Sequence, residues 1–180
     1  PGETVMIFGV GQIGSFCAQV AKISGARVIA VDARELARRS ALDLGFDVVI
    51  DPSRQDMTEI VKSEAAAGPD VIVEVAGTPE YYPQFVDMLG RSGRIVMVGN
   101  TFTEQVTLDL RKLQSKEASL ITSKACIGAD YVRALDLVRW GKLRLNWMDG
   151  TAIMTYRMED FPRARQEWMD LQNALYVITP

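Results

Sequence analysis

The stretch TVMIFGVGQIGSF, residues 4–16, decides the fold of this 180-residue chain. It opens with a short apolar run, residues 4–8, which is typical of a strand buried on both faces. Glycines follow at Gly9, Gly11 and Gly14, and beyond them apolar residues recur at the spacing of one helix face. The stretch therefore predicts a strand, a tight glycine turn and a helix in direct succession.

The glycine turn has the chemistry of a phosphate-binding loop. The N-terminus of a helix presents unpaired backbone N–H groups and a partial positive charge, which suit the pyrophosphate of a dinucleotide. Gly9 would permit the tight turn, Gly11 the close approach of the phosphates, and Gly14 the close packing of the helix on the sheet. Gln12 and Ile13 would donate backbone N–H groups. A glycine pattern alone also fits a purely structural turn. The residues that follow it are therefore needed to decide whether the turn binds phosphate.

Asp32 supplies the second half of the motif. It follows the next predicted strand, residues 27–31, about 20 residues beyond the glycines, where the acid that binds a ribose diol is expected. A carboxylate there accepts hydrogen bonds from both ribose hydroxyls of NAD and repels the 2′-phosphate of NADP. Arg34 and Arg38 would favour NADP, since guanidinium groups suit phosphates. Both arginines also fit a solvated helix face, and Arg38 could instead stack on adenine. We predict NAD and leave NADP open.

The same alternation of strand and helix continues along the chain. Each of the first strands is a continuous apolar run followed by a helical pattern, which is typical of a parallel sheet covered on both faces. The sequence thus predicts an α/β fold, a doubly wound parallel sheet of the Rossmann type with three αβα layers, formed as one domain by residues 1–180. The expected strands are residues 4–8, 27–31, 47–50, 71–75, 94–98, 119–122, 153–158 and 175–178.

Helices are expected between these strands, and glycines close several of them. Thr78 is the predicted N-cap of the helix that begins at Pro79. After that helix the pattern is less regular. Apart from the helix after the glycine turn, the expected helices are residues 37–44, 57 to about 68, 79 to about 89, 108–117, 131–140 and 159–171.

Two further acidic residues lie at the ends of predicted strands, where ligands bind in such sheets. Asp51 precedes Pro52 and also fits a plain turn residue. Glu74 lies within an apolar strand, and a buried carboxylate needs a partner. Glu74 would either hydrogen-bond near the cofactor or point outward at the strand end, and both readings stay open.

The composition argues against several classes of partner. The net charge of −3, with both signs interspersed, gives no reason to expect a nucleic acid or an anionic membrane. No apolar stretch reaches the roughly 20 residues that span a bilayer, and no signal peptide is visible. Cys17 and Cys126 lie far apart without a C-x-x-C pair, which fits a reducing, cytoplasmic location.

Histidine is absent from the sequence. It is the commonest metal ligand and the usual general acid or base near neutral pH. Two isolated cysteines without histidine do not build a Cys/His zinc site. We therefore expect neither a catalytic residue nor a metal ligand here, and no turnover by this chain alone. Because it begins at Pro1 and not at Met, it reads as a piece of something longer or as a processed chain.

Several stretches together resemble the cofactor domain of the zinc-dependent medium-chain dehydrogenases, in the branch of alcohol, polyol and threonine dehydrogenases. The likeness runs in order over essentially the whole chain, so it is more specific than the glycine pattern. It is carried by PGETV (1–5), GVGQIG (9–14), VD (31–32), LGFDVV (44–49), VAG (75–77), GRIVMVG (93–99) and GKL (141–143).

The resemblance implies an NAD(H)-binding domain that positions nicotinamide for hydride transfer with an alcohol or carbonyl substrate. The zinc ligands would lie in an N-terminal GroES-like catalytic domain absent from this chain, to which residues 175–178 would return. The family's arginine five residues after the acid is Ala37 here, so Arg38 takes its adenine role in this assignment. The implied cofactor contacts are Gly9, Gly11, Gln12, Ile13, Gly14, Asp32, Arg38, Val75, Ala76, Gly77, Val98 and Gly99.

The family also forms dimers through an edge strand of this domain, and residues 119–122 are the corresponding run. Two other functions compete with the dehydrogenase reading. A stand-alone NAD(H)-sensing or NAD(H)-binding module would use the same loop without catalysis. An adenosylmethionine-dependent methyltransferase uses a similar sheet, but the later elements here follow the dehydrogenase order.

Overall fold

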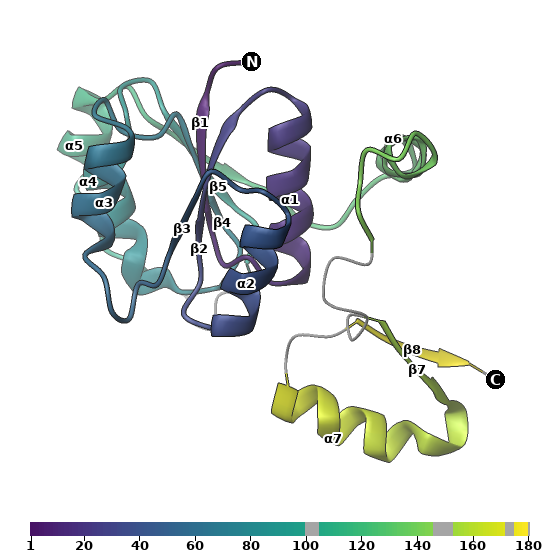
Figure 1. The fold of residues 1–180 in the computed structure, drawn as a ribbon. Coiled ribbons are helices and arrows are strands. Elements are labelled where there is room, and N and C mark those ends of the chain that lie inside the picture. The colour runs from purple at the N-terminus through teal and green to yellow at the C-terminus, as the bar shows by residue number, and fades with distance from the viewer. Residues whose placement is uncertain (100–104, 146–152, 172–174, 180) are drawn as a thin grey trace.

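The computed structural model describes residues 1–99, 105–145, 153–171 and 175–179 (Figure 1). Its centre is a sheet of six strands in the order β3-β2-β1-β4-β5-β6, and every neighbouring pair is parallel. The chain moves outward from β1 to β3 and then crosses back to β4, so the strand order reverses between β1 and β4. The strands are β1 (Thr4–Phe8), β2 (Arg27–Val31), β3 (Val48–Ile50), β4 (Val71–Glu74), β5 (Arg94–Met97) and β6 (Ser119–Thr122).

Five helices cover the two faces of this sheet. In Figure 1, α1 and α2 lie on one side and α3, α4 and α5 on the other, which confirms the predicted doubly wound α/β fold with three layers. The bounds are α1 (Gln12–Ile23), α2 (Glu35–Asp43), α3 (Met57–Glu64), α4 (Tyr82–Met88) and α5 (Leu110–Ser115), with a 3-10 turn, η1 (Pro79–Tyr81), before α4.

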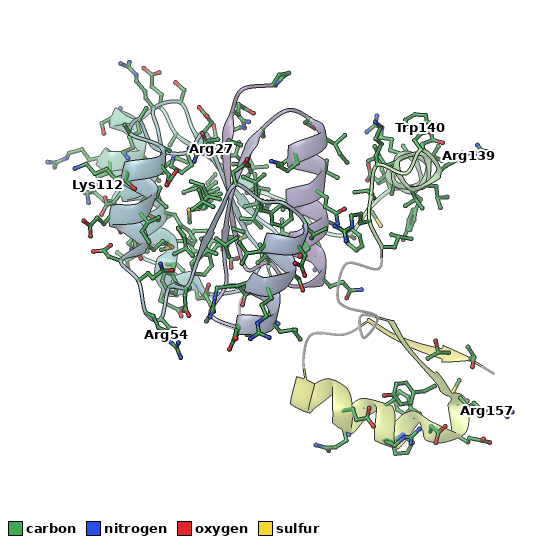
Figure 2. All side chains as sticks on the ribbon, in the orientation of Figure 1. Arg27, Arg54, Lys112, Arg139, Trp140 and Arg157 are labelled. Atoms are coloured by element: carbon green, nitrogen blue, oxygen red, sulfur yellow. The ribbon has the colours of Figure 1, made fainter. Side chains whose placement is uncertain are left out.

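The two faces of β1 show why the strands are continuous apolar runs. Successive side chains of a strand point to opposite faces. Met6 and Phe8 belong to the core cluster beneath α3 and α4, whereas Val5 and Ile7 belong to the cluster beneath α1 and α2. Because helices shield both faces of the sheet from water, the side chains that point to either face are apolar. Figure 2 shows the side chains crowding the space between the sheet and each helix layer.

The last part of the chain does not join the six-stranded sheet. After α6 (Gly128–Arg139), β7 (Ile153–Arg157) and β8 (Leu175–Thr179) pair in parallel as a separate two-stranded sheet. The 3-10 turn η2 (Met158–Asp160) and α7 (Phe161–Leu171) connect these two strands. In the described parts of the chain, no helix combines the length and the apolar character needed to cross a bilayer.

Several predicted boundaries differ from those of the structure. The helix expected up to about residue 68 ends at Glu64, because Ala65 leaves the helical angles, with φ −142° and ψ 82°. Gly68, at φ +83°, lies in the turn that follows. The helix expected from Pro79 begins as the 3-10 turn η1, and Thr78 takes the predicted N-cap position before it. Thr78 makes no side-chain cap and instead directs its N–H and its hydroxyl toward Glu74 Oε1, at 3.3 and 3.5 Å.

Candidate nucleotide-binding site

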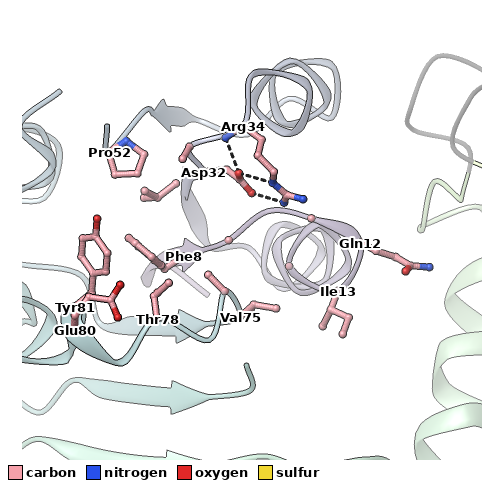
Figure 3. A pocket seen from close by; sticks show the side chains of 16 residues that line it. Phe8, Gln12, Ile13, Asp32, Arg34, Pro52, Val75, Thr78, Glu80 and Tyr81 are labelled. Carbon is pink, nitrogen blue, oxygen red and sulfur yellow. Dashed lines mark hydrogen bonds and ion pairs between the residues drawn. The ribbon is translucent and has the colours of Figure 1, made fainter. Parts of the chain in front are cut away.

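A cleft of about 760 Å³ opens at the carboxyl ends of β1, β2 and β4 (Figure 3). This is the point where the strand order reverses, and ligands of open α/β sheets bind there. The cleft is lined by the glycine turn, the end of β2, the turn after β3 and the segment after β4. The lining residues are Phe8, Gly9, Gly11, Gln12, Ile13, Gly14, Val31, Asp32, Ala33, Arg34, Pro52, Val75, Ala76, Thr78, Glu80 and Tyr81.

Gly9 and Gly14 are required by backbone packing. Gly9 has φ +91°, and a Cβ added there would lie 2.9 Å from the backbone nitrogen of Ala76. A Cβ on Gly14 would lie 1.8 Å from the carbonyl oxygen of Gly9, so only glycine lets α1 pack this closely on the turn. These two positions fix the direction of α1 relative to β1.

Gly11 differs from these two glycines, because no backbone atom would obstruct a side chain at this position. It has ordinary extended angles, φ −68° and ψ −157°, and a Cβ there would meet only the guanidinium of Arg34, at 2.9 Å from Nη2. Gly11 is also the N-cap residue of α1, and no side chain caps that terminus. The first turn of α1 carries no acidic residue. The helix therefore directs its partial positive charge and its N–H groups toward the cleft.

Asp32 lies at the end of β2 and is only 7% exposed. Its Oδ2 accepts hydrogen bonds from Val10 N at 3.0 Å and from Arg34 Nη2 at 2.8 Å. Its Oδ1 accepts from the backbone N and the Nε of Arg34, both at 2.9 Å. The Asp32 carboxylate raises the pKa of Arg34. The contact with Val10 ties the glycine turn to β2, and the two-pronged contact keeps Arg34 in the cleft (Figure 3).

Arg38 lies beside this pair but is not among the lining residues of the cleft. Its Nη1 donates to the carbonyl oxygens of Asp32 and Ala33, at 2.9 and 2.6 Å, and its Nη2 lies 2.8 Å from Asp51 Oδ2. The pKa of Asp51 is held low by hydrogen bonding to Ser53 and also by the charge of Arg38. Arg38 thus joins the turn after β2 to the turn after β3, and its contact with adenine stays a prediction.

Val75 and Ala76 line the cleft, whereas Gly77, Val98 and Gly99 lie next to it around Glu74. The amides of Val98 and Gly99 both donate to the carbonyl oxygen of Glu74, at 2.9 Å. A Cβ on Gly99 would lie 2.5 Å from the nitrogen of Gly77, so close packing already explains the glycine.

Glu74 is fully buried, which decides between the two readings of the sequence: the side chain points inward. Its Oε1 accepts a hydrogen bond from Gly77 N at 2.6 Å, so the carboxylate holds the turn that follows β4. Burial, together with the nearby charge of Glu74, raises the pKa of Tyr82. Glu74 therefore shapes the floor of the cleft without lining it.

Sequence reasoning missed the aromatic wall of the cleft. Tyr81 packs against Phe8 with the two rings tilted by 45° and their centroids 4.6 Å apart. Pro52 lines the same cleft. Phe8 could have been found, because it is the last residue of the strand before the glycine turn. Tyr81 and Pro52 could not, since they reach the cleft only through the pairing of β4 and β3 with their neighbours.

A zinc centre does not fit the residues present. The sequence has no histidine, and no group of three or more acidic or cysteine side chains that could hold a metal occurs among the described residues. Cys17 is partly buried and Cys126 is exposed, and both are free thiols.

The sequence pattern of the zinc-binding dehydrogenase family matches residues 13–140, which is more than half of the chain. The chain belongs to this family. A sorbitol dehydrogenase from Halalkalibacterium halodurans is 30% identical over 145 residues, 79% of this chain and 42% of that protein. An NAD-dependent alcohol dehydrogenase from Sulfurisphaera tokodaii is 29% identical over 147 residues, 80% of this chain and again 42% of the relative.

Solved structures share the fold. The benzyl alcohol dehydrogenase of Acinetobacter calcoaceticus superposes with a TM-score of 0.86 at 23% identity, over 99% of this chain and 49% of that one. The chain therefore spans less than half the length of these dehydrogenases.

Proposed function

We propose that this chain is the NAD(H)-binding part of a zinc-binding dehydrogenase that interconverts an alcohol or polyol and its carbonyl product. The observation that carries the proposal is the uncapped N-terminus of α1, which opens onto the cleft behind Gly9 and Gly11. A pyrophosphate needs unpaired N–H donors and a positive dipole end, and this turn offers both. The side chain that lies over Gly11 is the guanidinium of Arg34, which is itself a cation. The NAD-dependent relative supports the choice of cofactor.

When bound, NAD⁺ supplies the chemistry by accepting a hydride from the alcohol carbon. The residues of this chain bind and orient the cofactor. Gln12, Ile13 and Gly14 would bind the phosphates through their backbone amides, and Asp32 the adenosine ribose. The apolar wall of Phe8 and Tyr81 would exclude water from the adenosine half of the cleft. The backbone at Val98 and Gly99, held by Glu74, would meet the nicotinamide end.

We also propose that the isolated chain binds NADH but does not turn over. Zinc acting as a Lewis acid on the alcohol oxygen, and the substrate contacts, would come from the remainder of the full-length protein. The test is an assay of alcohol and polyol oxidation by the pure 180-residue chain. Oxidation well above background would contradict the proposal that this part only binds the cofactor.

The binding test uses Gly11→Ala, because Gly11 has backbone angles that alanine adopts freely. The added methyl displaces only the end of Arg34 and fills the space that the phosphates need. We expect NADH to bind the unmodified chain and the Kd of Gly11→Ala to rise at least about tenfold, roughly 1.4 kcal/mol or more. Gly128→Ala is the matched control, since a Cβ there meets nothing within 4 Å. No binding by the unmodified chain, or equal binding by Gly11→Ala, would refute the assignment.

We propose a homodimer formed through β6, an edge strand of the six-stranded sheet. All four of its residues are exposed, Leu120 at 45% and Ile121 at 42%. An exposed edge presents unpaired N–H and C=O groups that a second strand satisfies. Two β6 strands paired about a twofold axis would also cover these apolar side chains.

A further inference from the structure

Glu74 is a carboxylate that is buried without a cation beside it. Its side chain is 0% exposed at the carboxyl end of β4. Its Oε1 accepts a hydrogen bond from the amide of Gly77 at 2.6 Å and a longer one from the amide of Thr78 at 3.3 Å, and both donors are neutral. Among the described residues, none of the ion pairs includes Glu74. A carboxylate in the interior is costly unless a positive charge compensates it.

This carboxylate lies where two turns meet. The backbone oxygen of Glu74 accepts hydrogen bonds from the amides of Val98 and Gly99, so one residue holds both the turn after β5 and the turn after β4. A Cβ added to Gly99 would lie 2.8 Å from Glu74 Oε2 and 2.5 Å from the nitrogen of Gly77. Both glycines are half-buried. The carboxylate therefore lies just beneath glycine backbone at the carboxyl ends of β4 and β5.

The second nucleoside of a bound dinucleotide would lie over these turns. In the proposed site the pyrophosphate is at the N-terminus of α1 and the adenosine ribose is at Asp32, on the end of β2. In the sheet, β2 and β3 lie on one side of β1, whereas β4 and β5 lie on the other. A dinucleotide extends across the point where the strand order reverses, so its nicotinamide end reaches the carboxyl ends of β4 and β5.

We propose that the buried charge of Glu74 makes this site favour the oxidised cofactor, NAD⁺, over NADH. The nicotinamide ring carries a positive charge in NAD⁺ and none in NADH, and opposite charges attract strongly where water is excluded. The amides of Gly77 and Thr78 stabilise the ionised form of the carboxylate. Burial raises the pKa of Tyr82, and the negative charge of Glu74 raises it further. This inference rests on the proposed NAD(H) site and specifies which redox state it prefers.

The other carboxylates in or beside the cleft do not take this role. Asp32 and Asp51 are each compensated by an arginine at 2.8 Å. Glu80 lines the cleft but is exposed, so water and salt screen its charge. Glu74 differs from these three because it is both buried and without a cation.

The experiment measures the Kd of NAD⁺ and the Kd of NADH for the 180-residue chain by isothermal titration calorimetry, at one pH and one ionic strength. Glu74→Gln keeps the length of the side chain and an oxygen for the amide of Gly77, and it removes the charge. We expect the ratio of the Kd of NAD⁺ to the Kd of NADH to rise at least about fivefold in this variant. Because both constants come from the same protein, a partial loss of fold raises both alike and leaves their ratio unchanged.

Further variants separate the charge from the structure. Asp87→Asn changes the net charge by the same amount on α4, at an exposed carboxylate that pairs with Lys112 outside the lining of the cleft, and should leave the ratio unchanged. Glu74→Asp keeps the charge but shortens the reach to Gly77, so it should weaken both cofactors alike. If circular dichroism shows that Glu74→Gln does not fold, Glu74→Met removes the same charge with an apolar side chain of similar length.

The outcomes separate this inference from the proposed function. If both cofactors bind the unmodified chain and Glu74→Gln leaves the ratio of the two Kd values unchanged, the role of the charge is refuted and the NAD(H) site stands. An equal change of the ratio in Asp87→Asn would refute it as well, because the effect would then belong to the net charge. If neither cofactor binds the unmodified chain, the proposed function falls, and the role of Glu74 with it.

Discussion

The region from β1 to β5 and the helix α6 differ in where their apolar side chains lie. From β1 to β5 most of them lie inside: Phe85 on α4 and Ile72 on β4 are fully buried between sheet and helices. On α6 several lie outside, such as Leu135 at 67% exposed, and Trp140 directly after the helix is 65% exposed. Figure 2 labels Trp140 beside α6. The first region builds its own core, whereas the second presents a surface that a further part of the protein, or a second copy, would cover. The cleft proposed to bind the cofactor is lined by the first region.

The largest expected effect comes from removing one apolar side chain from each region. Phe85→Ala empties a site that is 0% exposed and should lower the free energy of unfolding by about 3–5 kcal/mol. Leu135→Ala removes an exposed side chain and should change it by no more than about 0.5 kcal/mol. Urea unfolding followed by circular dichroism measures both. Similar losses in the two variants would show that α6 is packed in solution and that the comparison is wrong.

The next effect concerns the buried carboxylate that holds the floor of the cleft. Glu74→Ala removes the acceptor of the partly buried Gly77 amide. A donor left unsatisfied in the interior costs about 1–3 kcal/mol, and we expect a loss toward the lower end of that range here. Glu74→Gln keeps an oxygen at this place and should recover part of the loss. Thermal unfolding of the two variants provides the comparison. Equal stability of Glu74→Ala and the unmodified chain would mean that this contact contributes nothing.

The proposed dimer contact at the edge strand β6 is tested by measuring self-association, because a change there should hardly alter the stability of the fold. Ile121→Lys places a charge in the middle of β6, where Ile121 is already 42% exposed. We expect the unmodified chain to sediment as a dimer and the variant as a monomer, with nearly the same unfolding midpoint at low concentration. Lys124→Ala, just beyond the strand, is the control. A variant that remains dimeric would move the interface away from β6.

The smallest effect is a dependence of stability on pH. Hydrogen bonding to Ser53, and the charge of Arg38, hold the pKa of Asp51 below its ordinary value of 3.8. Because the folded pKa is lowered, the stabilisation is complete above the unfolded value and is lost as the pH falls through the folded one. Unfolding free energies measured from about pH 6 down to about pH 2.5 should therefore fall less steeply in Asp51→Asn. The same dependence of unfolding free energy on pH in both proteins would show that Asp51 does not contribute to it.

Most of the sheet and part of the site could be predicted from the sequence, for identifiable reasons. Residues 4–8 and 27–31 form the predicted strands because each is a continuous apolar run that is buried on both faces. The glycine turn was predictable because the spacing of its glycines reflects local backbone packing. The N-cap position of Thr78 was predictable from Pro79 after it. Its contact with Glu74 Oε1 was not, because the sequence left the direction of the Glu74 side chain open.

The partners of Arg34 and Arg38 could not be predicted from the sequence, since they depend on how neighbouring strands and turns are placed. Arg38 reaches Asp51 only because β3 lies beside β2, a register that the sequence does not specify. Arg34 and Asp32 are two residues apart, but whether the arginine turns back onto the acid or outward to solvent depends on the turn after β2. The separate pairing of β7 with β8 likewise follows from neither segment alone.

The central claim is that NADH binds at the glycine turn and not at the exposed C-terminal part. Titration of the isotopically labelled chain with NADH, followed by amide ¹⁵N–¹H spectra, tests it directly. We predict that the largest shifts fall on the amides of residues 9–14, followed by those at Asp32 and at residues 75–77, while α6 remains unchanged. Shifts concentrated on α6 or on β7 and β8, with residues 9–14 unmoved, would contradict it.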